Sequence, residues 1–160
     1  MTTVDPDAAA GLAIIEVASL LEALIDEHAR SVGGLSGQQY SLLRILIDAE
    51  GEVCMTDLAD MAAQSRSGLT YQCRQLEEAG LIERLRAAGD ERAVNIQITK
   101  QGRRAVQEIT PGVSELTRAA ILGQLRDSER TAFVSAVSGA RDRLRARVPT
   151  VAQRRRRVPR

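Results

Sequence analysis

The side chains best suited to chemistry in this sequence are hydrogen-bond donors and cations near its middle. Seven of them lie within ten residues, and these are Ser65, Arg66, Ser67, Thr70, Tyr71, Gln72 and Arg74. Arg86 and Arg92 follow shortly afterwards. Hydroxyl, amide and guanidinium groups of this kind bind the phosphates and base edges of double-stranded DNA. The cluster therefore predicts a nucleic-acid-binding surface and not a catalytic centre.

Several of these residues have a structural alternative beside their expected role. Gln72 can pair bidentately with adenine, whereas Arg66 is better suited to a phosphate. Tyr71 can donate to a phosphate or touch a thymine methyl group with its ring. Ser65 and Ser67 can instead cap the N-terminus of a helix.

Arg92 belongs to the run Gly89-Asp90-Glu91-Arg92, which suits the tip of a β-hairpin. An arginine at such a tip can enter a minor groove. The alternative is an ion pair with Asp90 that stiffens the turn. Asp90 is expected to be structural, and it can also pair with Arg84.

Other kinds of site find little support. His28 is the only histidine, and its position on an apolar stripe favours a core or interface role over a ligand pocket. Cys54 and Cys73 lie 19 residues apart without an adjacent cysteine or histidine, so we expect no metal site and no cofactor. Arg74 beside Cys73 would lower the pKa of that thiol and favour its oxidation. A small buried apolar residue is the simpler interpretation of Cys73.

Caps and hydrophobic spacing predict the elements that position these side chains. Thr56 is placed to cap a short helix, and a second helix follows to about residue 79, with Leu69, Cys73 and Leu76 at helical spacing. Gly80 suits the position after this helix, where a positive φ is needed.

A β-hairpin should follow the two helices. Residues 81–86 predict one strand, residues 87–92 a turn, and the alternation of Val94, Ile96 and Ile98 a second strand. Thr99 can cap the next helix. The predicted fold is mainly α with a small β-hairpin wing (α+β), in which a winged helix-turn-helix domain covers about 36–100.

Apolar helices flank this domain on both sides and predict a two-fold dimer. The first stripe is Ile14, Val17, Ala18, Leu21, Leu24, Ile25 and His28; the second is Val106, Ile109, Val113, Leu116 and Ala120; the last is Phe133, Val137, Ala140, Leu144 and Val148. The second resembles a coiled-coil seam, although Pro111 should kink or divide its helix. We expect dimerisation helices over about 9–32 and 101–148 within one domain, 9–148. Residues 1–8 and the Arg-rich tail 149–160, with Arg154–Arg157, should be disordered.

Four segments together resemble the MarR family of bacterial transcription regulators. They are residues 35–43 (LSGQQYSLL), 75–84 (QLEEAGLIER), the Asp90-Glu91-Arg92 run followed by 96–102 (IQITKQG), and 125–130 (LRDSER). The family often has Thr-Arg in its DNA-reading helix, whereas this chain has Thr70-Tyr71. It also has Arg74 where an acidic residue is frequent.

The resemblance implies a ligand-responsive homodimer. In such proteins a small aromatic acid or phenol binds between the dimer helices and the winged domain. Here the pocket would draw on Leu24, His28, Tyr40 and Arg44. The double-stranded DNA target would be a pseudo-palindromic operator.

Composition is consistent with a cytoplasmic protein, whereas net charge by itself does not argue for DNA binding. Residues 1–50 carry a net charge of −6, residues 51–105 are neutral, and residues 106–160 carry +7. We expect no membrane contact, because no run approaches the roughly 18 apolar residues that a membrane span needs.

The leading hypothesis is a dimeric transcriptional regulator, most simply a repressor released by an effector. One alternative is a winged-helix module that binds proteins without specific DNA recognition. Another is a regulator that senses oxidation through Cys73. No constellation of residues favours an enzyme.

Overall fold

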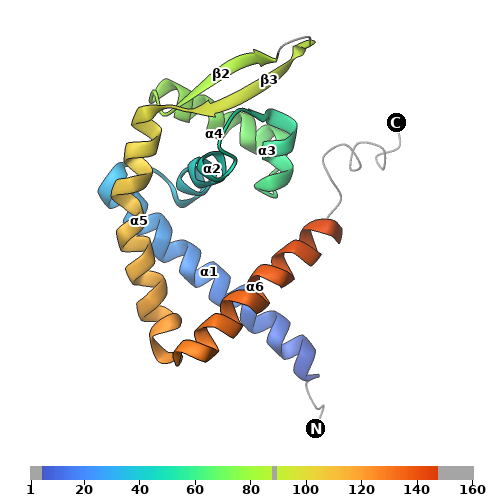
Figure 1. The fold of residues 1–160 in the computed structure, drawn as a ribbon, viewed down its shortest axis with the longest axis vertical. Coiled ribbons are helices and arrows are strands. Elements are labelled where there is room, and N and C mark those ends of the chain that lie inside the picture. Colours follow the sequence, from blue (N-terminus) through green and yellow to red (C-terminus); the bar gives the residue numbers. More distant parts are fainter. Residues whose placement is uncertain (1–4, 88–89, 148–160) are drawn as a thin grey trace.

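The computed structural model describes residues 5–87 and 90–147. Its elements are α1 (Pro6–Gly33), α2 (Gly37–Asp48), β1 (Val53–Cys54), α3 (Met55–Met61), α4 (Arg66–Glu78), β2 (Ile82–Ala87), β3 (Asp90–Ile98), α5 (Lys100–Ala120), the 3-10 turn η1 (Leu122–Gln124) and α6 (Asp127–Arg147). In Figure 1, α2, α3, α4 and the β2–β3 hairpin form one unit, and the long helices extend away from it. This arrangement confirms the predicted winged helix-turn-helix with helical flanks.

One apolar core holds the winged unit together. Its fully buried side chains come from every element of that unit and from α5: Leu42, Leu43, Leu46, Leu58, Leu69, Cys73, Leu76, Ile82, Ile96, Val106 and Ile109. The predicted seam of α5 is therefore wrong at its start, because Val106 and Ile109 pack into this chain's own core. Only the later part of that helix is left for a partner.

The hairpin is longer than predicted and belongs to a three-stranded sheet of order β1-β3-β2. β2 and β3 are antiparallel, with Ile82 opposite Ile98 and Arg84 opposite Ile96. β1 adds Val53 opposite Ile96, a pairing that the sequence analysis missed. The predicted turn over 87–92 is also wrong, since β3 begins at Asp90. β-pairing extends through the charged run because main-chain hydrogen bonds do not depend on side-chain polarity.

Helix caps fix where the helices begin and end. Ser36 and Gln39 form a capping box at α2, and Thr99 accepts a hydrogen bond from the Gly102 amide at α5. Gly80, at φ 71°, ends α4 in a Schellman motif, in which the Leu81 amide donates to the Leu76 carbonyl.

One predicted cap is wrong. α3 begins at Met55 after Cys54, so Thr56 lies inside the helix and does not cap it. The short strand β1 runs directly into α3, and this junction moves the helix start towards the N-terminus. The turn between α3 and α4 holds Ala63 at φ 53°, a left-handed conformation that is costly for a residue with a Cβ.

The long helices differ from expectation at two places. α1 begins at Pro6, because Asp5 accepts a hydrogen bond from the Asp7 amide and proline suits the first turn. The prediction that residues 6–8 are disordered is therefore wrong. Pro111 lies within α5 without dividing it, since the helix continues to Ala120. The predicted tail over 149–160 lies outside the described residues.

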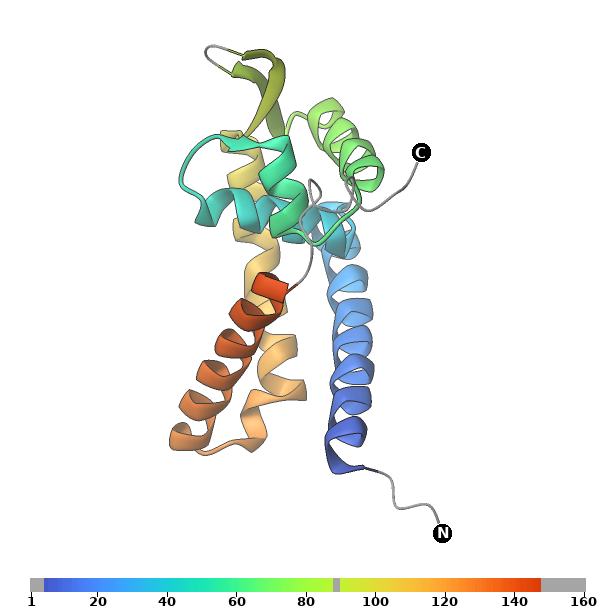
Figure 2. The same cartoon turned by 90° about the vertical axis from the view of Figure 1, so that its right-hand side faces the viewer.

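α1 is more apolar than the sequence analysis allowed. Within the described residues it is long and apolar enough to cross a membrane, and none of its most apolar window is buried. The expectation that no segment approaches this length was therefore wrong. Figure 2 shows the N-terminal half of α1 standing apart from the other helices. An exposed apolar face of this size needs a cover.

Candidate nucleic-acid interface

The orientation of α4 is set by the complete burial of one face. Leu69, Cys73 and Leu76 are each at most 1% exposed. Helical geometry then places Ser67, Tyr71 and Arg74 on the opposite face. Tyr71 is 51% exposed although it is a large aromatic residue. α4 therefore presents a polar, solvent-facing surface with one aromatic ring near its centre.

The first turn of α4 is held by its own hydroxyl groups. Ser65 caps the helix by accepting a hydrogen bond from the Gly68 amide at 3.2 Å. Thr70 donates to the Arg66 carbonyl at 2.7 Å, so its oxygen is left to accept. Arg66 donates to the hydroxyl of Thr56 at 3.2 Å and thereby joins α4 to α3. The expected capping role of Ser65 is thus confirmed.

Gln72 is occupied within the protein. Its amide nitrogen donates to the Gln38 side chain at 3.3 Å, and its amide oxygen is buried without a hydrogen-bond partner among the described residues. A bidentate contact with adenine would need this side chain to rotate outward. That predicted role therefore requires a rearrangement on binding.

Arg74 has only loose contacts. Its guanidinium lies 5.5 Å from the centre of the Tyr71 ring and 3.8 Å from the Glu78 carboxylate. Both partners in the ion pair are more than 60% exposed, so the pair adds little stability. The Arg74 charge remains accessible on the outward face of α4.

Arg84 ties the base of the wing to α4. Its Nε lies 3.0 Å from the carboxylate of Glu77. Arg84 therefore has a partner that the sequence analysis did not name, because β2 packs beside the end of α4. Its predicted pairing with Asp90 stays a prediction. Arg86 is exposed on the same strand. The side chains of Asp90 and Arg92 lie outside the described residues.

Cys73 does not have the environment of a reactive thiol. Burial raises the pKa of Cys73 to about 11, and the Arg84 charge only partly opposes this effect. The prediction that Arg74 would lower this pKa is wrong, since Arg74 lies on the outward face. The unfolded thiol ionises near pH 9, so Cys73 contributes stability that is lost as the pH rises from about 9 to 11.

The four predicted effector-pocket residues do not line one cavity in the single chain. Leu24 is 42% exposed on α1. His28 lies with Nε2 3.2 Å from the Ile109 carbonyl, which can only accept, so the ring donates and joins α1 to α5. Tyr40 is buried, with its hydroxyl 3.2 Å from that of Thr110. His28 therefore has a structural role between two helices of this chain, which agrees with the core or interface role that the sequence favoured over a ligand pocket.

Arg44 alone among the four lines a groove between α2 and α5. The groove holds about 530 Å³ and is lined by Arg44, Ile47, Arg103, Val106, Gln107, Thr110, Pro111 and Ser114. Arg44 is paired with Asp48 at 2.9 Å, and no carboxylate is among the lining residues. Two guanidinium groups above apolar side chains suit the carboxylate of a small acid.

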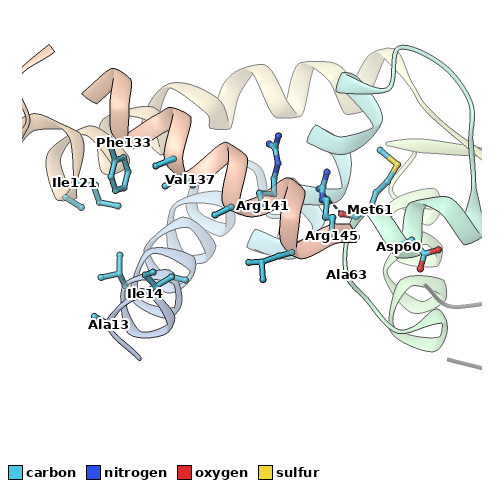
Figure 3. Close-up of a pocket in the computed structure, with 17 residues that line it drawn as sticks. Ala13, Ile14, Asp60, Met61, Ala63, Ile121, Phe133, Val137, Arg141 and Arg145 are labelled. Atoms are coloured by element: carbon cyan, nitrogen blue, oxygen red, sulfur yellow. Dashed lines mark hydrogen bonds between the residues drawn. The ribbon is translucent and has the colours of Figure 1, made fainter. Parts of the chain in front are cut away.

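A second, larger cavity of about 1340 Å³ separates α1 from α6 (Figure 3). Ile14 and Val17 of α1 face Phe133 and Val137 of α6 across it. Arg145 of α6 donates to the Met61 carbonyl at 3.1 Å and connects this helix to α3. The cavity walls are the apolar stripes that the sequence assigned to a dimer interface.

The order of elements, the exposed polar face of α4 and the adjoining hairpin together define a winged helix-turn-helix protein. A family model described as the MarR family matches residues 33–93, which are most of the winged unit. This match, the curated relatives and the solved structures together support a regulator of the MarR family.

Individual relatives agree with this assignment. The HTH-type transcriptional regulator FarR of Neisseria gonorrhoeae is 35% identical over 81 residues, which are 51% of this chain and 55% of that relative. The matched part thus spans about half of FarR. The crystal structure of AbsC from Streptomyces coelicolor is 25% identical with a TM-score of 0.75, covering 91% of this chain and 99% of AbsC. The crystal structure of NadR in complex with 4-hydroxyphenylacetate is 26% identical with a TM-score of 0.72, and the match covers 88% of this chain and 97% of NadR.

Sequence reasoning missed several residues that hold the predicted site residues in place or lie beside them. Glu77 contacts Arg84, Gln75 contacts Tyr71, and Gln39 contacts Gln75. Arg103 lines the groove beside Arg44. Their partners lie many positions away in sequence, apart from the helical neighbours Tyr71 and Gln75. Only the packing of α2, α4 and the sheet brings such pairs together.

The burial of Cys73 predicts a large difference between the two thiols. At pH 8 we expect iodoacetamide to modify Cys54, which is partly exposed, and to leave Cys73 unmodified until the chain unfolds. Mass spectrometry of native and urea-unfolded protein measures this. Cys54→Ala should abolish fast labelling, whereas Cys73→Ala should retain it. Rapid native labelling of Cys73 would contradict its assignment as an inert core residue.

Proposed function

We propose that the protein is a dimeric, sequence-specific DNA-binding transcriptional regulator. The observation that carries this proposal is the solvent-facing polar surface of α4, held rigid by the complete burial of Leu69, Cys73 and Leu76 beside an antiparallel hairpin. A helix of this kind fits a major groove, and the hairpin would place Arg92 against the adjacent minor groove. Ser65, Arg66, Ser67, Thr70, Tyr71, Gln72, Arg74 and Arg86 would contribute the remaining contacts.

A second copy of the chain would cover the apolar faces of α1 and α6. These faces expose Ile14, Val17, Phe133, Val137 and Leu144 by 40–69%. Two copies related by a two-fold axis would read half-sites about one helical turn apart. Such a dimer at a promoter would exclude polymerase and act as a repressor. The proposed location is the cytoplasm, with α1 covered by protein and not by lipid.

The alternatives explain fewer observations. A winged-helix module that only binds proteins has no need of the exposed Arg74 and Arg86 beside a hydroxyl-rich helix. A redox regulator acting through Cys73 conflicts with the raised pKa of that buried thiol. Similarity to transcription regulators likewise gives no support to an enzyme.

The DNA-binding proposal predicts a specific effect of Arg92. Wild-type protein should enrich a pseudo-palindrome from fragments of its own genome at physiological salt. Arg92→Ala should weaken binding to that fragment by about 1–3 kcal/mol and lower the salt slope by about one, because one cation is lost from the DNA contact. Fluorescence anisotropy at several salt concentrations measures both effects.

Arg118→Ala provides the matched control for this measurement. Arg118 is an exposed arginine on α5 that pairs with Glu115, away from the winged unit. We expect its replacement to leave affinity for the fragment unchanged. Absence of any enriched sequence for the wild type would overturn the DNA-binding proposal and favour the protein-interaction module.

The dimer proposal predicts dissociation when a charge enters the α6 face. Val137→Glu should yield a monomer in analytical ultracentrifugation, since an unpaired carboxylate in an apolar interface costs several kcal/mol. Ser135→Glu adds the same charge two residues away, on the opposite side of α6 from the cavity lining. It should remain dimeric. Equal behaviour of the two variants would remove the α6 face from the interface.

We also propose that a small aromatic acid or phenol releases the protein from DNA. The groove between α2 and α5 supports this with two guanidinium groups, from Arg44 and Arg103. A carboxylate bound there would join two helices that respectively belong to the winged unit and to the dimer-forming flank. Leu24, His28 and Tyr40 would act around this groove and not within it. Similarity to NadR, solved with 4-hydroxyphenylacetate, adds support.

Titration of the DNA complex with 4-hydroxyphenylacetate checks the effector proposal. We expect release of the enriched fragment by the wild type and at least tenfold weaker release by Arg103→Ala, because that variant loses one carboxylate partner. Arg104→Ala removes the neighbouring exposed arginine, which does not line the groove. It should respond as the wild type does. An unchanged response of Arg103→Ala would place the effector site elsewhere.

A further inference from the structure

Tyr71 ends a chain of side-chain hydrogen bonds that begins in another helix. The Ser36 amide donates to Gln39 Oε1 at 2.9 Å, Gln39 Nε2 donates to Gln75 Oε1 at 3.0 Å, and Gln75 Nε2 donates to the Tyr71 hydroxyl at 3.0 Å. The chain crosses from α2 to α4 at the glutamine pair. No role in DNA recognition follows from the sequence for either glutamine.

The direction of every bond in this chain is fixed by its first member. A backbone N–H can only donate, so Gln39 must turn its carbonyl oxygen towards Ser36 and its amide nitrogen towards Gln75. Gln75 must then meet Gln39 with its oxygen and Tyr71 with its nitrogen. An amide nitrogen cannot accept, so the Tyr71 oxygen accepts from Gln75. The Tyr71 proton is therefore available for a partner other than Gln75.

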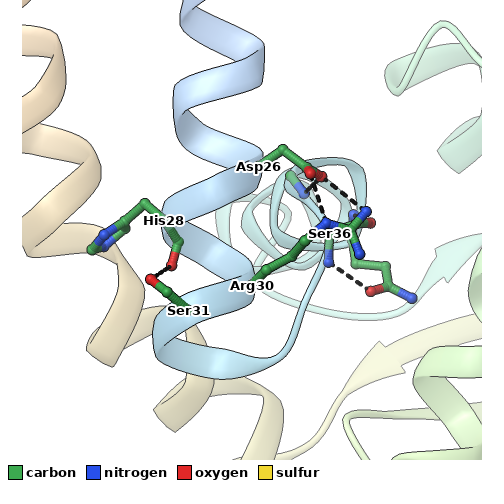
Figure 4. Close-up of polar contacts among 7 residues, drawn as sticks. Asp26, His28, Arg30, Ser31 and Ser36 are labelled. Atoms are coloured by element: carbon green, nitrogen blue, oxygen red, sulfur yellow. Dashed lines mark hydrogen bonds and ion pairs between the residues drawn. The ribbon is translucent and has the colours of Figure 1, made fainter.

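The first member of this hydrogen-bond chain, Ser36, lies beside a residue of α1. Asp26 accepts a hydrogen bond from the Gly37 amide at 2.8 Å and pairs with Arg30 at 2.7 Å. Figure 4 shows this group beside Ser36, with the Asp26 and Arg30 side chains directed at the start of α2. The Ser36 hydroxyl also accepts from the Gln39 amide at 3.1 Å. The capping box that orients Gln39 is therefore held from two sides.

We propose that Gln39 and Gln75 are positioning residues that make Tyr71 an obligate hydrogen-bond donor to DNA. This inference rests on the proposed DNA-binding function. A donor at this place selects an acceptor, which is a phosphate oxygen or the N7, O6 or O4 atom of a base edge in the major groove. It disfavours the amino groups of cytosine and adenine. Tyr71 thus occupies the place of the family's frequent arginine with a single, directed donor.

Replacing Gln75 by glutamate reverses the direction of the last bond. A carboxylate only accepts, so Glu at this position would accept from both Gln39 and the Tyr71 hydroxyl. The Tyr71 proton would then be directed inward, and its lone pairs would face the DNA. The added negative charge also repels DNA by itself. The same replacement in a Tyr71→Phe background measures that charge effect alone.

The experiment is a double-mutant cycle on the enriched genomic fragment, with Tyr71→Phe, Gln75→Glu and the double variant. Tyr71→Phe keeps the ring over Arg74 and should weaken binding roughly tenfold. Gln75→Glu should weaken binding at least threefold more in the Tyr71 background than in the Phe background. Thermal unfolding confirms that each variant is folded.

A second variant tests the hydrogen-bond chain at Gln39, which lies farther from the DNA-facing surface than Gln75. Gln39→Glu keeps the acceptor for the Ser36 amide and preserves the capping box, but it cannot donate to Gln75. We expect the loss of affinity to be about threefold larger with Tyr71 present than with Phe, since the added charge acts in both backgrounds. A half-site library separates the two acceptor sources: Tyr71→Phe relaxes one base position if a base is contacted, and weakens all sequences equally if a phosphate is contacted.

The outcomes separate this inference from the function on which it rests. A wild-type protein that enriches no sequence would overturn both. Specific wild-type binding with an additive cycle, or with full affinity in Tyr71→Phe, would overturn the directed donor alone. Coupling at both Gln75 and Gln39 would establish it.

Discussion

The packing of one face of α4 into the core is the constraint on which the rest of the structure depends. Because Leu69, Cys73 and Leu76 are excluded from solvent, α4 can neither rotate nor slide without opening a cavity. The outward face is thereby fixed, with Tyr71 near its centre. The same packing brings Glu77 to Arg84 and Gln75 to Gln39. It also explains why a cysteine in this helix has a raised pKa.

Directional contacts, besides apolar packing, connect the flanking helices α1, α5 and α6 to each other and to the winged unit. His28 donates from α1 to the carbonyl of Ile109, and Arg145 donates from α6 to the carbonyl of Met61. Both contacts end on backbone atoms. A shift of α1 would therefore be transmitted to α5, whose residues Val106 and Ile109 pack into the core. A ligand between α2 and α5 would act on this same connection.

The sequence predicted those elements that depend on local chemistry. Thr99 and Gly80 cap or terminate helices through neighbours within five residues, and the alternation of Val94, Ile96 and Ile98 indicates a half-buried strand. Features that depend on distant partners were missed or misplaced. The strand β1 exists only because β3 lies beside it. The start of α3 moved for the same reason, and Arg84 found its partner across an element boundary.

The interface residues show the same division. That Ser65 to Arg74 form one polar surface could be predicted from helical spacing alone. The hydrogen-bond partners of these side chains could not be predicted, since Gln72 donates to Gln38 and Arg66 donates to Thr56, both from other helices.

The exposed apolar face of α1 has a consequence for the stability of the folded state. If a second copy covers it, mass action makes thermal stability depend on protein concentration. The abundance of the chain would then set both how much protein survives and how much DNA is occupied.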